Sequence, residues 1–233
     1  MPQKPRKTIG GEKTKRFFAA CTAFLMATLG GTAAYGAEGA EYLTIEREVQ
    51  GENISFVYRY PQVVKAETPQ AQSILNTSFR EYGEYEALEA LRRSKSSGSP
   101  IKGELTFRVE HNTGELFSIA FINRGEDGVR RIHPFNLSGS TGRTVRVCDL
   151  FSDEEAQRTA GLLFGEYARE QKMPERLTEA LCTLPNNQPY YLTGTQLVLV
   201  FDKGEFFEGE TGSLEFSVDR EKLRGLFKEE YRN

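Results

Sequence analysis

The chain has 233 residues, of which 38% are hydrophobic and 27% are charged, and its formal net charge is −3 at pH 7. This composition is typical of a globular protein and excludes collagen-like and low-complexity chains. It also lacks the basic excess by which proteins bind nucleic acid, so no nucleic-acid partner is expected.

The N-terminal segment 1–36 has the order of a secretory signal peptide. Six Lys or Arg side chains precede an apolar run at 17–29, and small residues follow it. A positive start, a short apolar core and small residues define such a signal. We expect cleavage after Gly36 or Ala34, with an uncleaved anchor as the alternative. In both cases the remaining chain is exported to a secreted, periplasmic or cell-surface location, and it contacts the membrane only if the segment is uncleaved.

Without segment 1–36 the chain is considerably more acidic. The segment holds six Lys or Arg and one Glu, so its removal changes the net charge from −3 to −8. An acidic surface attracts and orients a basic protein partner. Mild acidity is also the ordinary condition of a soluble protein, so charge alone leaves the partner open.

The first half of the exported region predicts a hairpin and a long helix. Residues 42–49 and 53–60 are rich in β-branched and aromatic side chains and flank a short polar turn. Such a pattern predicts two antiparallel strands, the second of which should end at Pro61. A helix from Thr68, as N-cap, to Arg93 follows from the capping residue and the apolar spacing.

A run of strands comes next. A Ser- and Gly-rich loop at 94–100 separates the helix from strands at 102–110 and 115–123. Two further strands are expected at 129–138 and 143–148.

The C-terminal part alternates helices with short strands. Ser152 and Glu155 have the spacing of a capping box, so a helix should begin at Ser152. The further elements expected are a helix at 174–181, strands at 189–193, 196–201 and 213–218, and a closing helix at 220–229. Hairpin turns dominate this order, which predicts an α+β fold with a largely antiparallel sheet and helices packed on one face.

The order of several short phrases resembles a known pair of domains. They are Tyr60-Pro61-Gln62-Val63, His133-Pro134, Ser140-Thr141-Gly142-Arg143, Cys148-Asp149-Leu150-Phe151 and Pro189-Tyr190-Tyr191-Leu192. This order is similar to the paired extracellular domains of unknown function of RsiV-type anti-sigma factors, and to the N-terminal region of PdaC-type peptidoglycan deacetylases. The resemblance implies a first domain at 42–133 and a second at 134–229, forming one compact unit.

The resemblance implies a non-enzymatic binding module of the cell envelope. RsiV-type domains bind lysozyme, so a basic protein such as lysozyme, or a cell-wall glycan, is the expected partner. One departure is that Arg131-Ile132 replaces the small residues that usually precede the His-Pro pair of such domains. The alternative is a peptidoglycan or glycan hydrolase that uses carboxylates which the sequence does not identify.

Few residues stand out as candidates for a site. Cys148 and Cys182 can form a disulfide outside the cell or remain as two buried thiols. His133 is a weak ligand-contact candidate, and its alternative is a histidine at a strand end. Tyr190 and Tyr191 point in opposite directions if they lie in a strand, so one can pack in the core while the other stacks on a ligand. No catalytic residue, cofactor or metal site is expected.

Overall fold

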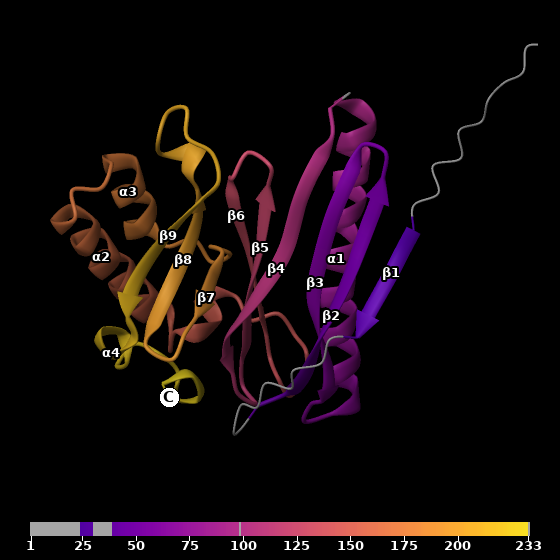
Figure 1. Ribbon diagram of the computed structural model, residues 1–233. Helices are drawn as coiled ribbons and strands as arrows, with labels where there is room; N and C mark the ends of the chain where they lie inside the picture. The colour runs from indigo at the N-terminus through magenta and orange to yellow at the C-terminus, as the bar shows by residue number, and fades with distance from the viewer. Residues whose placement is uncertain (1–23, 30–38, 98, 233) are drawn as a thin grey trace, which may run out of the picture.

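The computed structural model describes residues 24–29, 39–97 and 99–232 (Figure 1). The expected signal segment 1–36 therefore lies outside the described residues, apart from strand β1, Phe24–Leu29, which pairs with β2 in antiparallel orientation. None of the helices in the described ranges has the length and apolarity needed to cross a membrane.

Nine strands of the described residues form two separate sheets. The first sheet has the order β1-β2-β3-β4-β5-β6, and the second has the order β7-β8-β9. All neighbouring pairs are antiparallel except β3 and β4, which are parallel because helix α1 connects them as a crossover. The strands after β1 are β2 (Glu41–Gly51), β3 (Ile54–Lys65), β4 (Ile101–Asn112), β5 (Phe117–Gly125), β6 (Arg130–Leu137), β7 (Tyr190–Leu192), β8 (Gln196–Asp202) and β9 (Ser213–Asp219).

The helices cover the outer faces of the two sheets, so each sheet carries helices on one face only (Figure 1). They are α1 (Pro69–Ser96), α2 (Glu154–Glu170), α3 (Glu175–Thr183) and the short α4 (Arg220–Leu223). One core cluster lies between α1 and the first sheet, and another lies between the second sheet, α2 and α3. A third, small cluster joins the two sheets directly and contains Ala120, Ile132, Tyr191, Val198 and Val200.

This architecture confirms the predicted α+β class, with one parallel pair among antiparallel strands. The N-cap of α1 is also as expected, because the Thr68 side chain accepts a hydrogen bond from the Ala71 N–H at 3.1 Å. The expected boundary between 133 and 134 falls inside β6. The division into two domains stays a prediction.

Two strand predictions are wrong. Strand β3 does not end at Pro61 but continues to Lys65. Strand β4 pairs with β3 only as far as Tyr58, so one edge of β3 has no neighbouring strand at the proline, where an N–H is not needed. The segment 143–148 is not a strand, because Arg146 binds Asp149 through its backbone and its side chain and closes a 3-10 turn at Val147–Leu150.

Two helix predictions also need correction. The N-cap of α2 is Asp153, whose side chain accepts from the Ala156 N–H at 2.8 Å, whereas the Ser152 N–H donates to the carbonyl of Leu226. The closing helix ends at Leu223, because Phe227 forms a backbone bridge with Phe151 and leaves the helical path.

Candidate functional site

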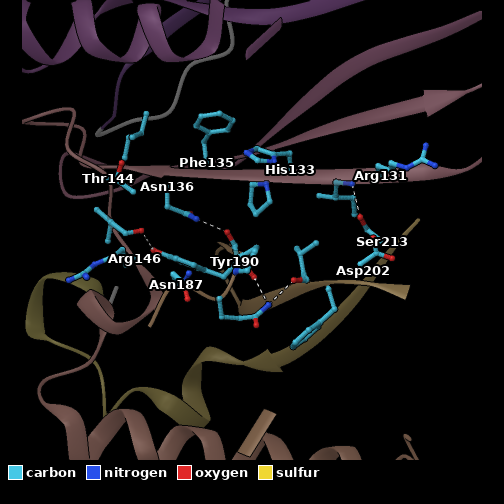
Figure 2. A pocket seen from close by; sticks show the side chains of 18 of the residues that line it. Arg131, His133, Phe135, Asn136, Thr144, Arg146, Asn187, Tyr190, Asp202 and Ser213 are labelled. Carbon is cyan, nitrogen blue, oxygen red and sulfur yellow. Dashed lines mark hydrogen bonds between the residues drawn. The ribbon is translucent and has the colours of Figure 1, made fainter. Parts of the chain in front are cut away.

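A cleft lies where the edge strand β6 faces the second sheet (Figure 2). Its volume is about 560 Å³, which is within the usual range for small-molecule sites. The walls are mainly apolar, with amide, hydroxyl and guanidinium groups placed among them. The lining includes Arg131, Ile132, His133, Pro134, Asn136, Thr144, Arg146, Asn187, Gln188, Tyr190, Phe201, Asp202 and Ser213.

The outer edge of β6 forms one wall of this cleft. The Ile132 N–H donates to Ser213 Oγ at 2.8 Å, and the Asn136 carbonyl accepts from the Val145 N–H at 2.8 Å. Pro134 lies between these two anchors and has no N–H. Because backbone groups alternate along an antiparallel strand, the Pro134 carbonyl points outward like that of Asn136. The open edge therefore offers acceptors to a ligand while the proline opposes pairing with another strand.

A buried polar network holds the floor of the cleft to the second sheet. Ser118 Oγ accepts from the Leu192 N–H at 2.9 Å and lies 2.6 Å from Asn136 Oδ1, to which it donates. Asn136 Nδ2 donates in turn to the carbonyl of Tyr190 (Figure 2). The Ser118 and Asn136 side chains of this network both have partners. The network therefore connects β5, β6 and β7 without leaving either side chain unsatisfied.

Asp202 and Arg146 of the cleft are already engaged within the chain, whereas Arg131, which also lines it, is exposed. Asp202 accepts from the Gly204 N–H at 2.8 Å and caps a short turn. Arg146 is paired with Asp149, and its hydrogen bonds hold the pKa of the Asp149 carboxyl below its usual value. Asp202 is the one carboxylate that lines the cleft among the described residues, and the same part of the chain holds no cluster of three metal-ligating side chains.

His133 does not end a strand but lies inside β6. Its ring stacks on Tyr82 of α1, with centroids 4.6 Å apart and planes at 20°, and its centroid is 5.0 Å from that of Phe135. The side chain is exposed on its outer side, yet the packed rings desolvate the imidazole and lower its pKa. His133 therefore faces α1, away from the polar network of the cleft floor (Figure 2).

Tyr190 and Tyr191 point to opposite sides of β7, as expected, and both are largely buried. Tyr190 is 2% exposed, and its hydroxyl donates to the Val145 carbonyl at 3.0 Å. Tyr191 is 6% exposed and donates to Glu215 between the sheets. Each ring belongs to a different core cluster, and Tyr190 also lines the cleft, so the contact of one ring with a ligand stays a prediction.

Both cysteines are free thiols and half-buried, so the disulfide alternative is not formed. Cys148 Sγ lies 3.7 Å from a carboxylate oxygen of Asp149. Cys182 instead packs on α2, where a Cβ added at Gly165 would lie 2.1 Å from its Sγ. The thiols belong to different contacts, one at the turn before α2 and one at the α2–α3 interface.

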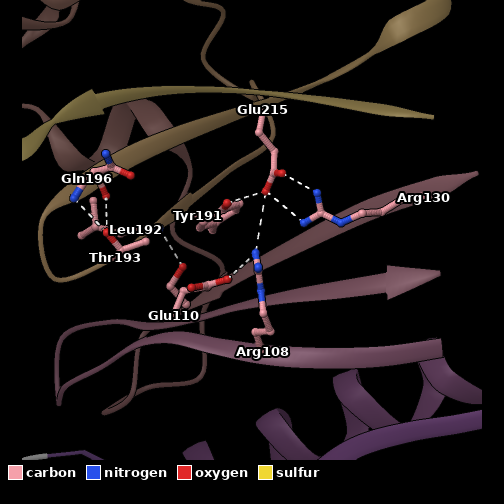
Figure 3. Close-up of polar contacts among 9 residues, drawn as sticks. Arg108, Glu110, Arg130, Tyr191, Leu192, Thr193, Gln196 and Glu215 are labelled. Atoms are coloured by element: carbon pink, nitrogen blue, oxygen red, sulfur yellow. Dashed lines mark hydrogen bonds and ion pairs between the residues drawn. The ribbon is translucent and has the colours of Figure 1, made fainter. Parts of the chain in front are cut away.

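A second polar cluster joins the two sheets (Figure 3). Arg130 Nη1 lies 2.6 Å from Glu215 Oε2, and Arg108 lies between Glu215, at 3.7 Å, and Glu110, at 2.8 Å. The Arg108–Glu110 contact is an ion pair, although the Glu110 oxygen lacks hydrogen-bond geometry. The Glu110 and Glu215 side chains are 16% and 24% exposed.

The two carboxyls of this cluster differ in pKa. Burial raises the pKa of Glu110, and the nearby Arg108 only partly opposes the rise. Burial also acts against ionisation of Glu215, but the hydrogen bonds from Arg130 and Tyr191 outweigh it and lower the pKa. Ionised Glu215 therefore stabilises the fold, whereas ionised Glu110 does not.

We expect Glu110→Gln to keep or raise the free energy of unfolding at pH 7, and Glu215→Gln to lower it by about 1–3 kcal/mol. The pKa of Glu110 is higher in the folded state than in the unfolded state. The difference in the free energy of unfolding between Glu110→Gln and wild type therefore shrinks as the pH falls through the folded-state pKa. Ionised Glu215 contributes fully to the free energy of unfolding when the pH is above the pKa that Glu215 has in the unfolded chain. This contribution is lost as the pH falls through the lower pKa of Glu215 in the folded state. Urea unfolding of wild type and of the two variants at pH 7 and pH 4 measures these differences in the free energy of unfolding. Equal losses in the two variants at pH 7 would contradict this assignment.

Comparisons with known proteins identify the fold. No family model and no curated protein matches the chain. Two crystal structures of DUF3298-family proteins are similar to it. The one from Pseudomonas aeruginosa has a TM-score of 0.54 and 16% identity, and the match covers 84% of this chain and 97% of that one. The one from Bacteroides fragilis has a TM-score of 0.50 and 12% identity, and the match covers 89% of this chain and 94% of that one.

At such identities the likeness shows a shared fold and no more. The neighbours belong to a family named as a domain of unknown function, in agreement with the expectation of such a domain. The links to RsiV-type and PdaC-type proteins stay predictions.

Proposed function

We propose, on the premise that the chain has the fold of DUF3298-family proteins, that it is an exported, non-enzymatic binding module of the cell envelope whose cleft holds a cell-wall glycan. The observation that carries the proposal is the make-up of the cleft. It combines apolar walls, outward backbone carbonyls and side-chain amides, and the one carboxylate that the described residues bring to it, Asp202, already caps a turn.

A glycan matches these groups chemically. Sugar hydroxyls can donate to the carbonyls along the open edge of β6, and the exposed Asn187 amide can both donate and accept. The apolar C–H faces of a sugar ring fit walls such as Pro134 and Phe201. A cleft with few, fixed polar groups among apolar walls is the usual design of a small-ligand site.

The hydrolase alternative has less support from the same geometry. Glycoside hydrolysis needs two carboxylates facing each other across the sugar. The cleft offers Asp202 alone among the described residues. Glu110 and Glu215 lie elsewhere, with the Arg108 guanidinium between them, and they form a structural contact between the sheets.

A basic protein such as lysozyme is the second candidate partner. The net charge of −8 without segment 1–36 favours it, since complementary charge speeds and orients association. This proposal also requires export, which the signal-like order of segment 1–36 supports. N-terminal sequencing of the secreted fraction should begin at Ala37 or Tyr35, and a chain retained in the cytoplasm would count against export.

The binding test uses the exported chain on purified peptidoglycan and on immobilised lysozyme. We expect retention on peptidoglycan that falls at least about fivefold with Asn187→Ala, because a lost hydrogen bond is worth about 1 kcal/mol. The control Asn53→Ala changes an exposed amide outside the cleft and should leave retention unchanged. Retention on lysozyme alone would replace the glycan with the second candidate, and retention on neither would overturn both.

A further inference from the structure

A smaller pocket lies on the opposite face of the first sheet from the cleft, where β2 and β3 meet α1. Its volume is about 160 Å³, and its lining contains two arginines. The lining residues are Arg47, Tyr60, Gln62, Asn76 and Arg80. A cavity of this size accommodates a group such as a carboxylate or a phosphate.

Arg47 brings an unsatisfied donor to this pocket. Its Nε is buried and has no hydrogen-bond partner in the described part of the chain. The carboxylate paired with it, Glu84, is at 3.9 Å, the limit of an ion pair. A buried guanidinium N–H without an acceptor is costly, and an oxyanion would satisfy it.

Arg80 adds a second charge without a close carboxylate. It precedes Glu84 by four residues on α1, a spacing at which opposite charges usually meet. No ion pair between Arg80 and Glu84 is present within the described ranges, because the Glu84 side chain is directed to Arg47 instead. Glu84 thus pairs with Arg47 alone, and the two guanidinium groups leave the lining of the pocket with a net positive charge.

The remaining walls are rigid and rich in donors. Asn76 is fixed to β3 by two hydrogen bonds, from the Val63 N–H at 2.7 Å and to the Val63 carbonyl at 2.9 Å. The rings of Tyr58 and Tyr60 stack with centroids 6.2 Å apart. Burial raises the pKa of both phenols, and the nearby Arg47 guanidinium only partly opposes the rise, so both hydroxyls remain protonated at neutral pH.

α1 can approach this wall because it carries a glycine there. A Cβ added at Gly83 would lie 3.1 Å from a ring carbon of Tyr58 and 3.2 Å from one of Tyr60. The close contact of helix and sheet holds Arg80 and Arg47 on the same small cavity. The pocket is therefore formed by packed secondary structure and not by a loop.

We propose that the pocket lined by Arg47 and Arg80 binds a small oxyanion group, either a carboxylate or a phosphate. Two guanidinium groups and neighbouring hydroxyl and amide groups form a donor-rich, positively charged recess, and charge-assisted bonds of arginine to such anions are among the strongest hydrogen bonds. The site lies on the other face of the sheet from the cleft, so it does not depend on the glycan proposal.

NMR of the full chain tests this directly through the Arg47 Nε–Hε signal. Inorganic phosphate and acetate are titrated separately at constant ionic strength with chloride. We expect a saturable shift with a dissociation constant on the order of 1 mM for at least one of them. The tighter of the two assigns the anion as phosphate or carboxylate. A shift that chloride alone reproduces, or no saturable shift with either anion, would overturn the proposal.

Variants separate the site from general charge effects. Arg80 is exposed, so Arg80→Gln should leave the melting temperature unchanged while it weakens anion binding at least about fivefold. The control Arg92→Gln lies on the same helix, in an exposed pair with Glu89, and should bind as wild type does. Equal weakening by both variants would mean that overall charge, and not this pocket, attracts the anion.

Discussion

Replacing Phe79 with alanine is expected to lower the free energy of unfolding by about 3–5 kcal/mol. Phe79 is 0% exposed and is the centre of the contact between α1 and the first sheet. Its ring centroid lies 5.5 Å from that of Phe117, 6.1 Å from that of Phe121 and 6.2 Å from that of Phe135. Truncation removes these contacts and leaves a cavity that a packed sheet cannot close.

The matched control is Tyr85→Ala, an aromatic truncation on the same helix. Tyr85 is 55% exposed, so its loss should change the free energy of unfolding by no more than about 0.5 kcal/mol. Urea unfolding followed by circular dichroism measures both variants. A loss below about 1 kcal/mol for Phe79→Ala would show that α1 does not pack on the sheet through this ring.

The second large effect is expected for Asn136→Ala, at about 2–4 kcal/mol of unfolding free energy. The substitution leaves the Ser118 hydroxyl without its acceptor and the Tyr190 carbonyl without its donor, in the buried space between the sheets. Buried groups that lose their partners suffer the full desolvation penalty.

A double-mutant cycle makes this prediction specific. Since Ser118 and Asn136 belong to one network, Ser118→Ala should cost less in the Asn136→Ala background than in wild type. Asn53→Ala, on an exposed turn, serves as the control and should be close to neutral. Additive losses for the pair would mean that the two side chains act independently.

The secondary structure was largely predictable because its signals are local. Thr68-Pro69 starts α1, and the alternating apolar residues of 42–49 and 53–60 form β2 and β3. Predictions failed where a tertiary contact competed with the local pattern. Ser152 has the spacing of an N-cap, but its backbone N–H donates to the carbonyl of Leu226. Asp153 is the N-cap residue of α2 instead.

The candidate site was much harder to predict. Ser118 lies inside an apolar strand, and a polar residue at such a position indicates a buried hydrogen-bond partner. The sequence does not identify that partner as Asn136, because the two residues meet only through the pairing of β5 with β6. The tyrosines were correctly placed on opposite faces of one strand, yet the sequence could not show that both faces are covered. Exposure is a property of the packed layers and not of the strand.

By itself the sequence determined the α+β class, most of the elements and the acidic charge of the chain without segment 1–36, because each depends on composition or on residues a few positions apart. Only the tertiary structure decided the cleft and the arginine pocket. The cleft joins Ile132 to Ser213 across 81 positions, and the pocket brings Arg47 of β2 beside Arg80 of α1. Such sites form when sheets and helices bury their apolar faces, and nothing in a local pattern records which polar groups meet as a result.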